Sequence, residues 1–114
     1  MFQLGEFTLA SGQQSKWKIE CDSLTSENWE ALALMASQIL PAFGSVEGVP
    51  RGGIPFADAL RKYATSGPLL IAEDVVTTGG SMERYRNGRP ARGIAVFSRG
   101  NHPDWVTPIF VMTH

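Results

Sequence analysis

The stretch LLIAEDVV at residues 69–76 decides the fold of this 114-residue chain. Every position except the two acids is apolar, and apolar and polar side chains do not alternate. Such a run is typical of a central strand in a parallel sheet, because helices cover both faces of that strand. The polar turn TTGGS follows at residues 77–81. The stretch therefore predicts an α/β fold with a ligand site beyond the carboxyl end of this strand.

Helical and strand patterns alternate along the rest of the chain. Trp29, Leu32 and Ala36 recur at helical spacing behind a capping residue at Thr25 or Ser26. The other expected elements are helices at residues 54–63 and 81–86 and strands at residues 7–11, 16–22, 45–50, 93–98 and 105–112.

Strands that alternate with helices through short links indicate a parallel sheet with right-handed crossovers. At this length we expect a single Rossmann-like domain over residues 1–114, with the short amino-terminal strands covering one side of the core. Pro108 indicates that the last strand lies at an edge of the sheet or carries a bulge.

The composition, 43% hydrophobic and 18% charged, is that of a protein with a packed core. A net charge of −1 gives no general attraction for nucleic acid. Eight of the ten Lys and Arg residues lie from Arg51 onward, which indicates either an anionic ligand or a solvated basic face. The single cysteine, Cys21, fits a reducing, cytoplasmic setting. The sequence shows no signal peptide and no apolar run of the ~20 residues that span a membrane.

The turn at residues 77–81 has the composition of a phosphate-binding loop. Gly79 and Gly80 allow positive φ angles and a close approach of the backbone to a ligand. Thr77, Thr78 and Ser81 add hydroxyl donors that suit the several oxygens of a phosphate monoester. An ordinary strand-to-helix turn would have the same composition. The patterns of P-loop and dinucleotide-binding sites, GxxxxGK[ST] and GxGxxG, are both absent from the sequence.

The adjacent acids Glu73 and Asp74 indicate what else this site binds. Two neighbouring carboxylates repel each other and lose solvation at the end of a buried strand. Ligand hydroxyls, a cation or water can satisfy them, and a ribose diol supplies such hydroxyls. The acids and the turn together therefore match a sugar that carries a 5-phosphate.

The stretch LLIAEDVVTTGGSM at residues 69–82 resembles the phosphoribosyl diphosphate (PRPP) signature of type I phosphoribosyltransferases, and EDVVTTGGS is closest to the orotate-type form. GEFTLASGQQS at residues 5–15 is similar to the amino-terminal segment of that family, near the base-binding region. GVPRGGIPFADAL at residues 48–60 resembles the loop that binds pyrophosphate and the helix after it. IAVFSRG at residues 94–100 resembles a later strand whose arginine helps to hold orotate.

The resemblance implies a role for each of these segments. Glu73 and Asp74 would be the catalytic acids, which bind the ribose hydroxyls and favour the positive charge that develops on the ring carbon. Pyrophosphate would be bound by the loop that contains a strained or cis peptide, and Mg²⁺ would be held mainly by PRPP oxygens and water. The implied binding residues are Thr77, Thr78, Gly79, Gly80 and Ser81 for the 5-phosphate, Arg51, Gly52 and Gly53 for pyrophosphate, and Thr77, Arg99 and Lys18 for the base. A surface charge at Arg51 and a strand-end salt bridge at Arg99 are the alternatives.

The chain departs from that family in two places. Members typically carry a strand and a long basic loop between the helix that ends here near Tyr63 and the PRPP strand, whereas this chain has only residues 64–68. Ala10 stands where orotate enzymes commonly have a lysine. Two functions follow from the resemblance: a Mg²⁺-dependent, orotate-type phosphoribosyltransferase, or a non-catalytic module that binds PRPP or a nucleotide. A general α/β domain that binds phosphosugars, outside this family, is a third alternative. A homodimer is expected, because so short a chain exposes sheet edges that a second copy could cover.

Overall fold

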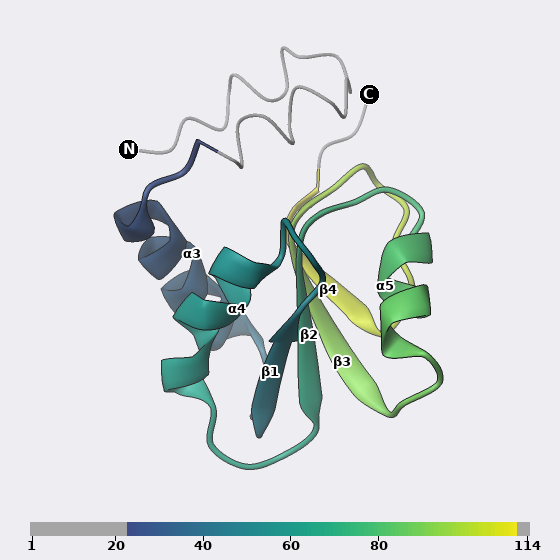
Figure 1. Ribbon diagram of the computed structural model, residues 1–114, viewed down its shortest axis with the longest axis horizontal. Coiled ribbons are helices and arrows are strands. Elements are labelled where there is room, and N and C mark those ends of the chain that lie inside the picture. Colours follow the sequence, from purple (N-terminus) through teal and green to yellow (C-terminus); the bar gives the residue numbers. More distant parts are fainter. Residues whose placement is uncertain (1–22, 112–114) are drawn as a thin grey trace.

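The computed structural model describes residues 23–111 of the chain (Figure 1). The expected strands at residues 7–11 and 16–22 lie outside these residues, and so does Lys18. Both strands, and the expectation that one domain spans residues 1–114, stay predictions.

A four-stranded parallel sheet forms the centre of the structure. Its strands lie in sequence order, and β2 and β3 pair over their whole lengths, from Leu69 opposite Ala91 to Val76 opposite Ser98. Pro108 lies in an edge strand, as the sequence indicated. The α/β fold with a parallel sheet is therefore confirmed. The strands are β1 (Ser45–Gly48), β2 (Leu69–Val76), β3 (Ala91–Ser98) and β4 (Val106–Val111).

Helix α3 (Ser26–Ile39) begins where the sequence placed its capping residue. Thr25 is its N-cap: the Thr25 hydroxyl accepts from the backbone N–H of Asn28, and the Asn28 side chain accepts from the backbone N–H of Thr25. Trp29, Leu32 and Ala36 are buried, so the apolar stripe read from the sequence is the face that packs on the core.

The two faces of the sheet are covered by different helices (Figure 1). Leu70 and Ala72 of β2 share a core cluster with residues of α3 and of α4 (Ile54–Leu60), which continues as the short helix η1 (Arg61–Tyr63). Ile71 belongs to a second cluster, with Met82 of α5 (Gly80–Arg86). Strand β2 is therefore buried on both faces, which is why its sequence is apolar without alternation.

The connections between the strands do not all have the same hand, so the expectation of uniformly right-handed crossovers is wrong. Strands β1, β2 and β3 are parallel and lie side by side in sequence order. The β1–β2 connection runs through α4 on one face, whereas the β2–β3 connection runs through α5 on the other. Two connections that move in the same direction across a parallel sheet, but pass over opposite faces, have opposite handedness. The β1–β2 and β2–β3 connections therefore differ in hand. In the described residues, only the five positions 64–68 link η1 to β2.

The β3–β4 connection contains no helix in the structure, where residues 99–105 run back beside α5 (Figure 1). The segment is held to the sheet edge, because the backbone N–H of Gly93 donates to the Trp105 carbonyl at 2.8 Å. Trp105 packs with the α5-side core cluster. The segment therefore takes the place of a second helix on this face.

The parallel arrangement brings three loops to the same end of the sheet, the carboxyl ends of the strands. The loop after β1, the turn after β2 and the start of the segment after β3 all follow the carboxyl ends of their strands. Within residues 23–111, no helix is long and apolar enough to cross a lipid bilayer.

Candidate functional site

The loop after β1 lies against the end of β2. Strand β1 pairs with β2 only as far as Gly48, opposite Ala72. Beyond that point, the backbone N–H of Val49 donates to the Ala72 carbonyl and the backbone N–H of Gly53 donates to the Val49 carbonyl, each at 2.9 Å. The Pro50–Arg51 peptide bond is cis, as the family resemblance implied.

Both acids of β2 are buried, and their side chains cap the local backbone. Glu73 is 6% exposed and Asp74 is 0% exposed. The backbone N–H of Asp74 donates to Glu73 Oε1 at 3.0 Å, and the backbone N–H of Val75 donates to Asp74 Oδ1 at 2.8 Å. Buried carboxylates that accept such bonds are held in fixed positions at the end of the strand.

The two acids lie on different sides of the strand end. The Asp74 carboxylate packs on the backbone of Gly52, so close that a Cβ on that glycine would lie 2.7 Å from Asp74 Cγ. Glu73 instead lines a cavity together with the turn that follows β2. Asp74 is not among the residues that line this cavity. Asp74 therefore lies beside the loop after β1, and Glu73 lies beside the turn after β2.

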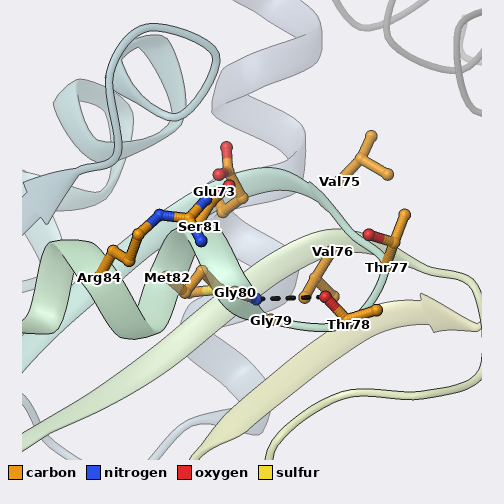
Figure 2. A pocket seen from close by; sticks show the side chains of 10 residues that line it. All are labelled: Glu73, Val75, Val76, Thr77, Thr78, Gly79, Gly80, Ser81, Met82 and Arg84. Atoms are coloured by element: carbon orange, nitrogen blue, oxygen red, sulfur yellow. Dashed lines mark hydrogen bonds between the residues drawn. The ribbon is translucent and has the colours of Figure 1, made fainter.

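The cavity has a volume of about 300 Å³ and lies over the turn between β2 and α5 (Figure 2). This volume is at the small end of the range for ligand pockets, ~300–1,000 Å³. Its walls combine a carboxylate, hydroxyls, glycine backbone and one guanidinium. The lining residues are Glu73, Val75, Val76, Thr77, Thr78, Gly79, Gly80, Ser81, Met82 and Arg84. All five residues predicted to bind the 5-phosphate are among them.

The turn itself owes its shape to Gly79. Gly79 has a φ of 89°, in the left-handed region that favours glycine. The next backbone N–H, that of Gly80, donates to the Thr78 hydroxyl at 3.4 Å. On its outer side the turn is covered by Pro103, because a Cβ on Gly79 would lie within 2.5 Å of Pro103 Cδ. The segment between β3 and β4 therefore packs against the turn, although none of its residues lines the cavity.

Arg84 is a lining residue that was absent from the predicted binding set. It lies on α5, four positions after Gly80, and its side chain is among those drawn around the cavity in Figure 2. The sequence could have indicated Arg84, because a residue four positions after Gly80 directs its side chain over the first turn of the same helix.

The other predicted site residues in the described part of the chain do not line the cavity. Arg51 is exposed on the loop after β1, where Gly53 is buried. Arg99 follows β3 and is exposed, and its backbone N–H donates to the Val76 carbonyl at 3.2 Å. Arg99 therefore lies at the same end of the sheet as the turn. In residues 23–111, no three His, Cys, Asp or Glu side chains are grouped so that they could hold a metal ion by themselves.

Two curated proteins are similar to this chain, and both are named orotate phosphoribosyltransferase. One is from Methanosarcina acetivorans and the other from Methanosarcina mazei. Each is 34% identical over 86 residues, which is 71% of this chain and 45% of the relative. The chain is a distant relative of the orotate phosphoribosyltransferases. The resemblance read from the PRPP signature is thus confirmed at the level of the family.

The chain spans less than half the length of the phosphoribosyltransferases that it matches. No protein-family model matches it, and no solved structure matches it significantly. The family relationship and the parallel α/β fold agree with each other, and the activity of the full-length relatives is a separate question for this shorter chain.

Proposed function

We propose that this protein binds PRPP and transfers its ribose 5-phosphate to a nitrogenous base of the orotate type, with release of pyrophosphate. The observation that carries the proposal is the cavity in which Glu73 faces the turn at residues 77–81. Hydroxyls and backbone N–H groups in this turn suit a phosphate monoester, and a buried carboxylate beside it suits ribose hydroxyls.

The two buried acids would act on the sugar. Glu73 would accept hydrogen bonds from a ribose hydroxyl, because it is the carboxylate that lines the cavity. Asp74, fully buried against Gly52, would stabilise positive charge on the ring carbon as the leaving group departs. Burial strengthens this interaction, because charges attract more strongly in a low-dielectric site.

Pyrophosphate would be received by the loop after β1, through Arg51 and the backbone of Gly52 and Gly53. Mg²⁺ fits the hard oxygen donors of this site, but the described residues offer no complete protein cage for it. The ion would therefore be held mainly by ligand oxygens and water, and it would neutralise charge on the departing pyrophosphate. For the base, we propose Thr77, Arg99 and Lys18 as binding residues.

One observation favours a second function, a non-catalytic module that binds PRPP or a nucleotide. Only residues 64–68 connect η1 to β2, so this part of the chain provides no long loop that could close over the cavity. Closure excludes water and commits the substrate in many transferases. Without closure, binding would survive and transfer would be slow.

The decisive experiment follows pyrophosphate release from PRPP and Mg²⁺ with a panel of bases that includes orotate. Turnover that requires one base supports the transferase. Saturable PRPP binding in calorimetry without turnover supports the binding module. Asp74→Asn is the matched variant, since it removes the charge and keeps the shape of the side chain. Absence of PRPP binding by the unaltered protein would reject both functions.

We also propose a homodimer. Strand β1 is a short edge strand, and three large apolar side chains of α3 are exposed: Leu34 at 47%, Met35 at 39% and Ile39 at 52%. Exposed apolar surface of this kind favours a protein partner, and symmetric pairs are the commonest assembly. Sedimentation at micromolar concentration tests this assembly, and a monomer there would contradict it.

A further inference from the structure

Arginines are concentrated around α5, and most of them are engaged away from the cavity. The Arg86 guanidinium lies 4.4 Å from the centre of the Trp105 ring and binds Glu83 at 2.7 Å. The Arg89 guanidinium binds the Glu47 carboxylate of β1 at 3.1 Å. These two arginines hold α5 to its neighbours and are not available to a ligand.

Arg92 lies elsewhere. It is exposed at the start of β3, at the opposite end of that strand from Arg99, and it lines a different cavity together with Asp104 and Trp105. The structure thus places Arg86, Arg89 and Arg92 apart from Arg84. Only Arg84 among them lines the cavity over the turn after β2.

The Arg84 side chain runs back along α5 toward the turn. Side chains of a helix point toward its amino terminus, so a residue covers the turn before its own position. Arg84 Nη1 lies 3.3 Å from the place where a Cβ on Gly80 would be. A side chain at position 80 would therefore be in tight contact with this guanidinium. Within the described residues, Arg84 makes no hydrogen bond or ion pair, so its donors face the cavity and solvent.

A cation in the cavity would offset the negative charge that gathers there when a phosphate binds. Glu73 and Arg84 are the two ionisable side chains among the lining residues. A phosphate monoester carries a charge of about −1.5 to −2 at neutral pH, and the Glu73 carboxylate would repel it. A guanidinium offsets this repulsion and can form two parallel hydrogen bonds with phosphate oxygens.

We propose that Arg84 binds the 5-phosphate of the ligand held by residues 77–81, and that it makes the site select phosphorylated over unphosphorylated ribose. This assignment rests on the proposed function, because it takes a sugar phosphate as the occupant of the cavity. It adds a charged contact to a loop that otherwise offers hydroxyls and backbone N–H groups. Arg84 is a binding residue here and has no part in the chemical step.

Calorimetry with ribose 5-phosphate and with PRPP, each in the presence of Mg²⁺, tests the assignment. Arg84→Gln should weaken the binding of both ligands by about tenfold or more, as expected for the loss of charge-assisted hydrogen bonds. Arg84→Lys should give a smaller loss, because it keeps the charge without the planar fork. Arg92→Gln is the matched control: it removes an exposed arginine at the other end of the sheet and should leave both affinities unchanged.

The outcomes separate this assignment from the proposed function. Equal affinities for Arg84→Gln and Arg92→Gln would overturn the role of Arg84 and leave the proposed function standing. A loss for PRPP without a loss for ribose 5-phosphate would also overturn it, since the guanidinium would then contact the pyrophosphate. If the unaltered protein binds neither ligand, the proposed function fails and the assignment fails with it. Thermal unfolding should be the same for all three variants, because Arg84 and Arg92 are exposed.

Discussion

The carboxylate of Asp74 lies directly on the backbone of Gly52, with no room for a side chain between them. A Cβ on Gly52 would lie 2.7 Å from Asp74 Cγ and 2.8 Å from Oδ1. This contact fixes the distance between the loop after β1 and the end of β2. The proposed pyrophosphate loop and one proposed catalytic acid therefore form a single packed unit.

Gly52→Ala should break this unit. The added methyl group has to displace either a fully buried carboxylate or the loop, and overpacking of this kind costs about 1–3 kcal/mol. Chemical denaturation measures the loss. A double-mutant cycle with Asp74→Ala provides the control, because removing the carboxylate makes space for the methyl group. If the two changes are simply additive, the contact does not carry the cost.

Gly79→Ala should be more damaging than Gly88→Ala, although both glycines have positive φ. Gly79 has a φ of 89° and Gly88 a φ of 77°, so alanine is strained at either position by about 1–2 kcal/mol. At Gly88 the new Cβ would meet nothing within 4 Å, whereas at Gly79 it would collide with Pro103. We therefore expect Gly79→Ala to cost about 1–3 kcal/mol more in the free energy of unfolding. Equal costs would mean that Pro103 moves aside freely.

Tyr85 should ionise at higher pH than an ordinary tyrosine. Burial raises the pKa of its hydroxyl above 10.0, and so does the hydrogen bond that it donates to Glu47 at 3.0 Å. Because the folded pKa is the higher one, this contribution to stability is complete below pH 10 and is lost as the pH rises through the folded value. Absorbance titration of tyrosinate in a Tyr63→Phe background isolates the signal. Glu47→Gln should lower the pKa of Tyr85, and an unchanged curve would contradict the assignment.

Glu83 should contribute to the acid sensitivity of the fold. The Trp105 indole N–H donates to Glu83 Oε2 at 2.7 Å, and this bond, followed by the bond from Arg86, lowers the pKa of the carboxyl below 4.5. The stabilisation is present above pH 4.5 and is lost as the pH falls through the lowered pKa. The NMR shift of the indole proton of Trp105 follows the change directly. In Glu83→Gln that shift should no longer respond to acid in this range.

Much of the fold was predictable, because the local signals agree with the packing. The Thr25 cap, the apolar stripe of α3 and the unbroken apolar run of β2 each predicted the element that the structure contains. Pro108 marked the edge strand for a local reason as well, since proline lacks the N–H that a central strand needs.

The hand of the crossovers was not predictable from these patterns. Handedness depends on which face of the sheet each helix covers. The apolar side chains that α4 and α5 bury could pack on either face, so the sequence pattern does not indicate the face. The backward course of residues 99–105 was hidden for a similar reason. A loop that replaces a helix leaves no periodic signal, and its position depends on single contacts such as that of Pro103 with Gly79.

For the candidate site, the sequence predicted several residues that line the cavity, but it did not predict how they are arranged. The glycines and hydroxyls of the turn were identified from composition, and they do line one cavity with Glu73. Adjacent acids in a sequence do not reveal that one faces the cavity and the other the Gly52 backbone. That division depends on where β1 ends against β2, at Gly48, which is a property of the paired strands.

The contact between Gly79 and Pro103 links the turn to a tryptophan whose fluorescence could report ligand binding. Pro103 touches the turn, and two positions further along the same segment the Trp105 indole is held by Glu83 and Arg86. A shift of the turn as an anion settles there would press on the proline and change the surroundings of a natural fluorophore. Tryptophan emission, recorded without any label, would then report occupancy in real time.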